Sequence, residues 1–275
     1  MEDKYKHTRE GKVLEVSNLG LFLGGRTILR EVNISVDNIV RPGMNQGQVV
    51  ALLGPSGIGK TQLFRCLAGL QKPTLGTIYV TKELIPVEAG MVGVVAQTYP
   101  LFKHRTVLGN LIVAGKQRGY SKKEAEERAM DLLSHYGLAD RKDFYPSKLS
   151  GGQRQRVAIL QQVLSSEHFL LMDEPFSGLD TIAKSTACDT ILQLSKLDEL
   201  NTTIVVTHDI ESAVKIADTV WLMGRMYDEQ HVLLGASIVK KYNLIERGLA
   251  WHENIQEMPE FHQMVNEIKN DFYRC

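Results

Sequence analysis

The sequence is poor in cysteine and carries no net charge, and each shortage excludes a class of function. Its 275 residues include three cysteines, Cys66, Cys188 and Cys275, which are far apart and lack CxxC or Cys/His spacing. We therefore expect free thiols in a reducing compartment, not a disulfide framework or a cysteine-based metal site. Its 32 basic and 32 acidic residues cancel, which disfavours wholesale binding to nucleic acid or to an anionic membrane surface.

Long apolar runs are also missing. No stretch approaches the length of a membrane span, and the N-terminal "MEDKYKHTRE" is charged and lacks the apolar core of a signal peptide. We expect a soluble chain whose membrane contact goes through a partner. Hydrophobic residues still make up 43% of the chain, which is enough for one globular unit or two closely joined subdomains.

The chain does contain an alternation of short apolar strands and helical periods. Such strands predict a parallel sheet covered by helices on both faces, and hence an α/β fold. From about Thr98 to Leu149 the strand pattern gives way to helices, which predicts an inserted helical subdomain, while Asp37 to Gly47 predicts a loop. The predicted strands are Lys12–Leu19, Thr27–Val36, Gln48–Gly54, Thr77–Val80, Met91–Gln97, Phe169–Asp173, Thr202–His208 and Thr219–Gly224.

The strongest motif is "GPSGIGKT", which fits G-x-x-x-x-G-K-[ST] between an apolar strand and a helical period. Its glycines let backbone N–H groups surround phosphates, while Lys60 reaches the β and γ oxygens and the Thr61 hydroxyl ligates Mg²⁺. This loop predicts a site for a nucleoside triphosphate. The predicted nucleotide-binding residues here are Gly54, Pro55, Ser56, Gly57, Ile58, Gly59, Lys60, Thr61 and Gln62.

Two further motifs complement this loop. The strand "FLLMDE" ends in two carboxylates, where ligands gather in a parallel sheet. Beside a phosphate loop, Asp173 is placed to hold Mg²⁺ and Glu174 to act as general base for the attacking water. The stretch "LSGGQ", with Ser150, opens a helix and forms a second phosphate seat that lacks a lysine. Taken alone, it also fits a glycine-rich helix cap.

The order of these motifs resembles that of the ATP-binding cassette (ABC) ATPases. The phosphate loop, Gln97, "LSGGQ", "LLMDEP", "SGLD" and a lone His208 at the end of a strand follow one another between about Leu14 and Gly235. The resemblance implies a P-loop NTPase (RecA-like) core with an N-terminal antiparallel β subdomain and an inserted helical subdomain. The predicted segments are 12–97 and 151–235 for the core, 98–150 for the helical subdomain and 236–275 for a C-terminal helical extension.

The resemblance also implies roles for single residues. Phe22 is similar to the aromatic residue that stacks on adenine, although an ordinary core phenylalanine fits equally well. Gln97 corresponds to the residue that contacts Mg²⁺ and the attacking water, and His208 to the histidine that contacts the γ-phosphate. Asp180 corresponds to the loop that couples two active sites across a dimer; alone it would be a helix N-cap. The implied catalytic residues are Glu174, His208, Gln97 and Lys60, and the implied Mg²⁺ ligands are Thr61, Gln97 and Asp173.

In this family two cassettes pair head to tail. The resemblance therefore implies that Ser150, Gly151, Gly152 and Gln153 act in trans on the γ-phosphate held by the partner's loop. The expected cofactors are ATP and Mg²⁺. The expected partners are a second copy of the chain or a homologous cassette, integral membrane permease subunits and a solute-binding protein, without direct contact to nucleic acid.

The leading functional hypothesis is an ATPase subunit that powers a membrane transporter. The stretch "PLFKHRTVLGNL" resembles ATPases of bacterial polar amino acid uptake systems, so we expect import of a small polar solute such as an amino acid. The expected location is the cytoplasmic face of the inner or plasma membrane, bound peripherally. Tyr99, Phe102 and His104 then lie near the membrane subunit, or they pack within the helical subdomain.

Two alternatives stay open at this point. One is a non-transport ABC ATPase in cofactor assembly or on nucleic acid or the ribosome, although the chain has neither a long coiled-coil insertion nor a second cassette. The other is an inactive regulatory cassette, which the intact motif residues oppose. The chain departs from the family at Gln62, at Gln161 and Gln162, and in a longer loop before the phosphate loop; none of these removes a residue needed for hydrolysis.

Overall fold

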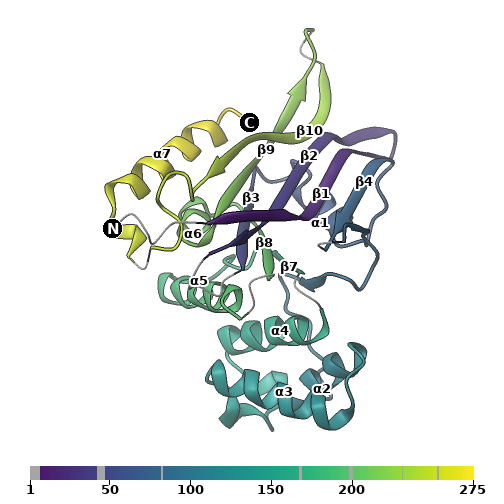
Figure 1. The fold of residues 1–275 in the computed structure, drawn as a ribbon, viewed down its shortest axis with the longest axis vertical. Coiled ribbons are helices and arrows are strands. Elements are labelled where there is room, and N and C mark those ends of the chain that lie inside the picture. Colours follow the sequence, from purple (N-terminus) through teal and green to yellow (C-terminus); the bar gives the residue numbers. More distant parts are fainter. Residues whose placement is uncertain are drawn as a thin grey trace.

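The computed structural model describes residues 7–41, 47–81, 83–166, 169–197, 201–230, 232–252 and 254–275. Within these ranges the strands form one mixed sheet in the order β5-β4-β1-β2-β10-β9-β3-β8-β7-β6 (Figure 1). The strands are β1 Thr8–Leu23, β2 Arg26–Val40, β3 Gln48–Leu53, β4 Leu75–Val80, β5 Ile85–Pro86, β6 Gly93–Val95, β7 Phe169–Asp173, β8 Thr202–Thr207, β9 Thr219–Tyr227 and β10 Leu233–Asn243. The α-helices are α1 Lys60–Leu67, α2 Val107–Gln117, α3 Lys122–His135, α4 Gly151–Ser165, α5 Thr181–Ser195, α6 Ile210–Ile216 and α7 Pro259–Phe272.

One half of the sheet is parallel, as the apolar runs predicted. Strands β6, β7, β8, β3 and β9 pair in parallel, and every residue of β3 and β8 is buried. The register places Leu53 beside Thr207, and Asp173 beside Val206. The carboxyl ends of β3, β7 and β8 therefore meet at one edge of the sheet, where α/β proteins bind ligands.

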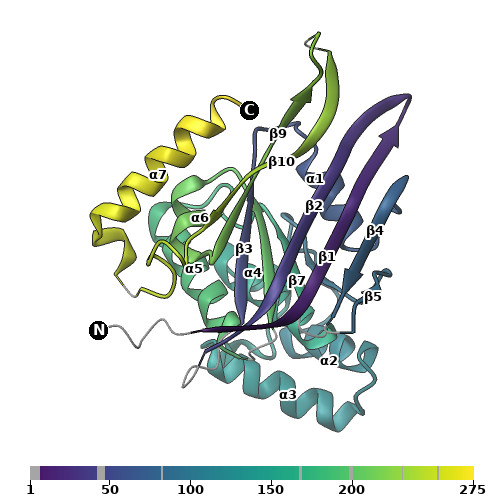
Figure 2. The ribbon, with the colours of Figure 1, turned by 45° about the horizontal axis from the view of Figure 1, so that its top comes forward.

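The other half is antiparallel and curls away from the parallel strands (Figure 2). Here β1 pairs with both β2 and β4. The prediction of a loop from Asp37 was wrong for the residues up to Val40, because β2 continues that far and Ile39 pairs with Arg9. The buried Ile39 side chain packs in the hydrophobic core, which keeps the chain extended there. Residues 42–46 of the predicted loop lie outside the described residues.

The inserted helices α2 and α3 pack with α4 in the lower part of Figure 1. Ala129, Leu133 and Leu160 are fully buried in their shared core. A capping box begins α3, since Ser121 Oγ accepts from Glu124 N at 3.3 Å and Ser121 N donates to Glu124 Oε2 at 2.9 Å. The helical reading of this stretch is therefore confirmed.

The strand β6 lies at the end of the sheet, and α4 covers part of its edge. Gln162 Oε1 accepts a hydrogen bond from Val94 N of β6 at 3.1 Å. Its neighbour Gln161 is buried. Gln162, where the sequence departs from the ABC pattern, thus accepts from a backbone amide that has no further strand beside it among the described residues.

The C-terminal segment differs in part from the prediction. Residues 236–243, expected in a helical extension, complete β10, which pairs antiparallel with β9 along its length. The hairpin was missed because β9 runs to Tyr227, three residues beyond the predicted strand end at Gly224. The predicted final helix is present as α7, which packs against α6 and buries Phe261, Met264, Val265 and Ile268.

A buried ionic cluster connects this C-terminal segment to β3. Asp218 Oδ2 accepts from Val49 N at 2.8 Å, and its Oδ1 accepts from the Trp251 indole and lies 3.7 Å from Arg41 Nη2. The Arg41 guanidinium lies 3.5 Å from the centre of the Trp251 ring. Burial raises the pKa of Asp218 to about 6, although Arg41 and the two N–H donors oppose this shift.

We expect Asp218→Ala to destabilise the fold by about 3–5 kcal/mol, because it removes the acceptor of two buried donors and the counter-charge of buried Arg41. Urea unfolding of the variant measures this loss. Arg9→Gln is the matched control, since Arg9 makes ion pairs with Asp37 and Glu246 while its side chain is half exposed. That variant should lose less than about 1 kcal/mol. Equal losses in the two variants would contradict the assignment of a stabilising cluster at Asp218.

Candidate functional site

The phosphate loop between β3 and α1 has the backbone that its glycines require. Gly59 has φ of 116°, a conformation that side chains disfavour, and a Cβ at Gly54 would lie 3.0 Å from the Met223 carbonyl oxygen. Lys60 Nζ donates to the carbonyl oxygens of Gly54 at 2.6 Å and Pro55 at 3.1 Å. Burial lowers the pKa of Lys60, while the nearby charges of Glu174 and Asp173 act in the opposite direction.

The two carboxylates at the end of β7, Asp173 and Glu174, lie close enough to Lys60 for their charges to affect its pKa. Glu174 adopts a positive φ of 49°, and its N–H donates to Val206 O of β8 at 2.8 Å. Burial and the neighbouring Glu174 raise the pKa of Asp173, and Lys60 opposes them. Two acids and one ammonium group thus share this edge of the sheet.

His208 is brought against Glu174. The ring Nδ1 lies 2.9 Å from Glu174 Oε2, and the Thr207 hydroxyl lies 3.4 Å from the same oxygen. With Nδ1 protonated, the imidazole donates to the carboxylate and directs Nε2 elsewhere. The sequence-predicted residues Lys60, Asp173, Glu174 and His208 therefore gather around the carboxyl ends of three neighbouring strands.

Gln97 follows β6 and contacts the loop after Glu174. Its amide nitrogen donates to Ser177 Oγ at 3.2 Å, so its amide oxygen is the atom suited to a metal ion. Sequence reasoning missed two links close by. Tyr99 Oη and Gln155 Nε2 both donate to Pro175 O, at 3.2 and 2.9 Å. Gln155 is buried although it is polar, and nothing in its sequence context indicated which carbonyl it would bind.

Phe22, near the end of β1, is 49% exposed. The alternative of an ordinary core phenylalanine therefore does not hold, and stacking on adenine stays a prediction. Of the residues proposed to contact membrane subunits, Phe102 is 44% exposed and lies with its ring against His104 at a centroid distance of 6.0 Å. Tyr99 instead is partly buried against the core around α4.

The second phosphate site predicted from the sequence lies at the start of α4, where Ser150 is the N-cap. Ser150 Oγ accepts from Gln153 N at 3.2 Å, and Ser150 N donates to Gln153 Oε1 at 3.0 Å, so both residues form a capping box. A Cβ at Gly151 or at Gly152 would meet nothing within 4 Å. The packing of the described residues thus gives no reason for these two glycines, whereas close approach of another molecule would.

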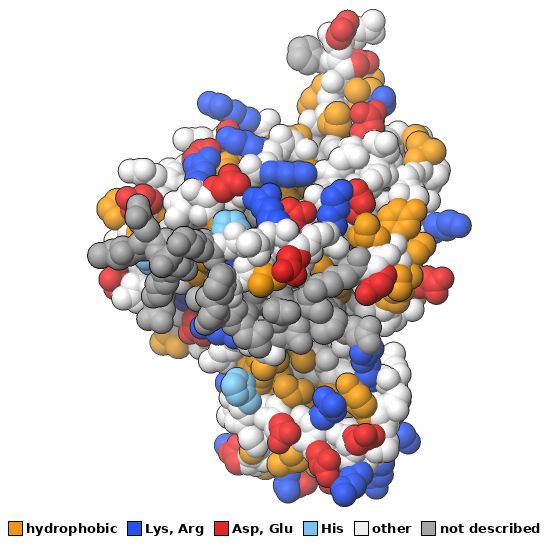
Figure 3. Space-filling view, in the orientation of Figure 1, with side chains coloured by type: hydrophobic (Ala, Val, Ile, Leu, Met, Phe, Trp, Pro, Cys, Tyr) orange, Lys and Arg blue, Asp and Glu red, His pale blue; other side chains and the backbone are white. Residues whose placement is uncertain are grey.

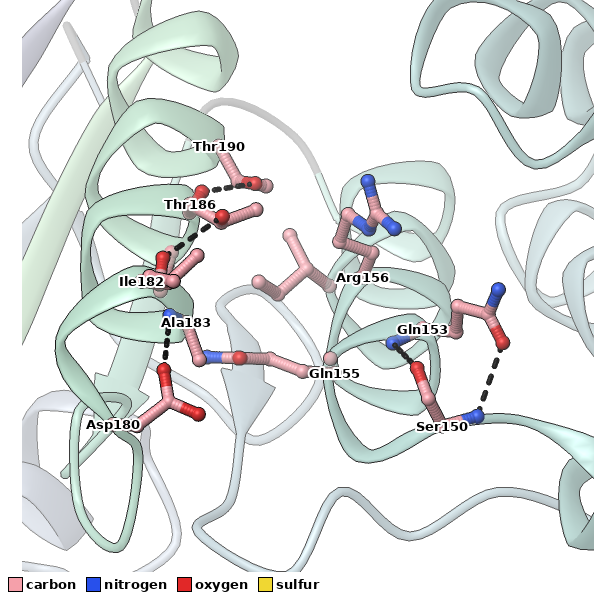
Figure 4. A pocket seen from close by; sticks show the side chains of 12 residues that line it. Ser150, Gln153, Gln155, Arg156, Asp180, Ile182, Ala183, Thr186 and Thr190 are labelled. Carbon is pink, nitrogen blue, oxygen red and sulfur yellow. Dashed lines mark hydrogen bonds between the residues drawn. The ribbon is translucent and has the colours of Figure 1, made fainter.

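A groove of about 330 Å³ runs between α4 and α5, from Ser150 and Asp180 at their starts to Ile159 and Thr190. Figure 4 shows Ser150 and Gln153 on one side and Asp180 on the other. Asp180 Oδ1 accepts from Ala183 N at 2.8 Å and so caps α5. Ile182 lies on the same rim and is 82% exposed. The first turns of α4 and α5 thus offer backbone donors and an apolar side chain to solvent.

Comparisons with known proteins agree with this arrangement. A sequence model described as ABC transporter matches residues 38–177. The chain belongs to the ABC transporter ATPase family. It is 38% identical over 232 residues to the L-cystine transport system ATP-binding protein TcyN of Escherichia coli (strain K12), covering 78% of this chain and 89% of that protein. It is 37% identical to the sulfate/thiosulfate import ATP-binding protein CysA of Synechococcus elongatus, covering 79% of this chain and 61% of that protein.

Solved structures of ABC ATPases share the fold. CbiO1 from Clostridium perfringens, part of the ABC transporter complex cbiONQ, matches with a TM-score of 0.72 and 23% identity over 94% of this chain and 100% of that one. The ADP- and Pi-bound dimer of the ATP-binding cassette MJ0796 matches with a TM-score of 0.64 and 25% identity over 84% and 98%. The predicted α/β P-loop NTPase fold, the family and the ATPase activity are thereby confirmed. Among the described helices, none is both long and apolar enough to cross a membrane.

Proposed function

We propose that this ABC ATPase powers the import of a small polar solute, such as an amino acid, through a partner permease. The observation that carries the proposal is the separation of two sites: His208 and Lys60 lie with Glu174 at one edge of the sheet, whereas an added Cβ at Gly151 or Gly152 at the start of α4 would meet no described residue within 4 Å. The printed names of TcyN and CysA, both transport proteins, support the transport role. A peripheral position on the cytoplasmic membrane face and a solute-binding protein partner follow from this role.

The proposed chemistry uses the chain's own residues to bind ATP and to activate the attacking water. Lys60 exchanges its two carbonyl partners for the β and γ oxygens of ATP, where its charge is better matched. Glu174 then takes a proton from the attacking water, with His208 holding the carboxylate from the other side. Stacking on Phe22 would hold the adenine, and Ser56, Gly57 and their loop neighbours would surround the phosphates.

The donor set also fits Mg²⁺. Thr61, Gln97 and Asp173 offer hydroxyl, amide and carboxylate oxygens, which are the ligands that this hard cation prefers. The pKa of Asp173 is raised by burial and by Glu174, so a divalent cation there would relieve an unfavourable charge. Bound Mg²⁺ supplies charge neutralisation of the β- and γ-phosphates.

We further propose that two chains close head to tail around ATP. Ser150, Gly151, Gly152 and Gln153 of one chain would then face the γ-phosphate held by the other, with Asp180 beside them. The Ser150 hydroxyl oxygen accepts from Gln153 N, which leaves its own hydrogen available for donation to a phosphate oxygen. Loss of the γ-phosphate removes this link and lets the dimer open.

A non-transport ABC ATPase remains the second candidate. Members that act on nucleic acid would need a basic surface, yet lysine, arginine and acidic side chains are interspersed on the face seen in Figure 3. The 38% identity to TcyN also favours the transport role. Isolation of the chain from its native membrane separates the two candidates: a polytopic membrane protein supports transport, while ribosomes or nucleic acid support the alternative.

Mixing two inactive variants tests the composite site. In a head-to-tail dimer, a Ser150→Arg chain and a Lys60→Ala chain together form one intact site, from the phosphate loop of the first and the α4 terminus of the second. We expect each variant alone to be inactive and an equal mixture to regain about a quarter of the wild-type ATPase rate, since half of the dimers are mixed and each has one intact site. The measurement is phosphate release.

The matched control mixes Lys60→Ala with Glu174→Gln chains. Both substitutions damage the same half of the composite site, so no arrangement of the two chains gives an intact one. This mixture should stay inactive. If the first mixture shows no recovery, or if both mixtures recover equally, the head-to-tail arrangement is wrong.

A further inference from the structure

The loop that carries His208 is held by its neighbour Asp209. Asp209 Oδ1 accepts from Ser212 N at 3.0 Å and caps α6, while Asp209 N donates to the Thr207 hydroxyl at 3.1 Å. Thr207 and His208 both approach Glu174 Oε2. Any rotation of the Asp209 side chain or backbone would therefore shift two contacts of the proposed general base.

A residue on another helix fixes Asp209 in turn. Lys184 Nζ, from the second turn of α5, lies 2.5 Å from Asp209 Oδ2. The hydrogen bond that Lys184 donates to Asp209 raises the pKa of Lys184. Burial raises the pKa of Asp209, but the hydrogen bonds that Asp209 accepts from Lys184 and Ser212 outweigh this effect, so its pKa is lowered. Both partners are thus charged at neutral pH, and the pair is a short charge-assisted contact.

We infer that Lys184 is a positioning residue for hydrolysis, which holds His208 against Glu174 through Asp209. Lys184 N also donates to Asp180 O at 2.8 Å, so the same residue ties the His208 loop to the helix start that Figure 4 places on the groove. The inference rests on the proposed roles of Glu174 and His208. It adds a residue outside the motifs from which those roles were taken.

A neighbouring lysine, Lys215, serves as the control. It distinguishes a role of Lys184 in positioning His208 from a general role in holding α5 against α6. Lys215 of α6 donates to Ser185 Oγ at 3.1 Å and lies 3.6 Å from Asp189 Oδ1, both on α5. It therefore joins the same two helices with the same side chain, without touching Asp209 in the contacts described. If Lys184 served only to join α5 and α6, replacing either lysine would have the same effect.

The experiment compares Lys184→Met with Lys215→Met by steady-state ATP hydrolysis. Methionine keeps an unbranched, apolar stem and removes the ammonium group. We expect Lys184→Met to lower kcat about tenfold while KM for ATP changes less than about twofold, and Lys215→Met to keep the wild-type kcat. Lys184→Arg should restore most of the rate, because it keeps the charge at Asp209. Asp209→Asn, which still caps α6, should match Lys184→Met.

Two double variants complete the test. Because Lys184 and Asp209 act as one unit, Lys184→Met should cause no further loss in an Asp209→Asn chain, and none in a His208→Ala chain. Equal kcat values for Lys184→Met and Lys215→Met, or a full additional loss on the His208→Ala background, would overturn the inference. If Glu174→Gln or His208→Ala itself keeps the wild-type rate, the proposed function fails instead, which distinguishes the two failures.

Discussion

Replacing Glu174 by glutamine should slow ATP hydrolysis by about 100-fold or more, because the amide cannot take a proton from water and general-base catalysis contributes about 10²–10⁴-fold. The substitution is nearly isosteric, and its amide oxygen can still accept from His208 Nδ1, so the geometry of the pair is kept while the base is lost. ATP should still bind and should now accumulate with a closed dimer. Phosphate release measures the first effect, and size-exclusion chromatography with ATP measures the second.

Glu211→Gln is the control for this result. Glu211 lies three residues from His208 and pairs at the surface with Lys269 at 3.2 Å, so its replacement removes a nearby negative charge without touching Glu174. This variant should hydrolyse ATP at the wild-type rate. A Glu174→Gln chain that is as active as this control would show that another group activates the water.

Replacing Lys60 by alanine should weaken ATP binding by about 100-fold. Charge-assisted hydrogen bonds contribute about 1.5–3 kcal/mol each, and the variant removes the ammonium group expected at the β and γ oxygens. Isothermal titration with ATP measures the affinity. The fold should survive, since the Lys60 side chain contacts only the carbonyls of Gly54 and Pro55 in the hydrogen bonds described.

The matched control here is Arg65→Ala. Arg65 lies on the exposed face of the same helix, α1, and carries the same charge. Its removal tests whether a general loss of positive charge on α1 weakens the binding of an anion. ATP affinity should stay within about twofold of wild type, because an exposed charge is screened by solvent and salt. Unchanged affinity in Lys60→Ala would reject the phosphate-loop assignment.

The hydrolytic edge could be predicted from the sequence because its parts are local. A buried strand, a glycine turn and a helix occupy one continuous stretch at Gly54 to Thr61, and the strand ending in Asp173 is equally self-contained. Parallel pairing predicts that the strand ends lie at one edge of the sheet. The role of His208 came from the resemblance to the ABC ATPases, and its contact with Glu174 follows from the pairing of β7 with β8 in the structure. The sequence did not predict the antiparallel hairpin of β9 and β10. Its second strand, β10, has no clean alternation of buried and exposed residues, so the period of a strand is not visible there.

The links between elements could not be predicted, since each depends on the relative placement of helices that are distant in sequence. Lys184 reaches Asp209 from 25 residues away, and Gln155 reaches Pro175 from 20. Lysine and glutamine are common in helices, and the sequence around them does not indicate which residue of another element each will contact. The sequence predicted that Ser150 and Asp180 each lie at the start of a helix. It did not predict that the two helix starts would line one groove.

The hydrogen bond from Val94 N to Gln162 bears on whether a second molecule can pair with the outer strand β6. The outermost strand of a sheet is a template on which another chain can add by backbone pairing, and repeated addition leads to insoluble fibrils. Gln162 blocks that addition at Val94 by taking its hydrogen bond from within the molecule. Gln162, at a position where the chain departs from its family's pattern, thus removes one backbone donor with which a second molecule could pair.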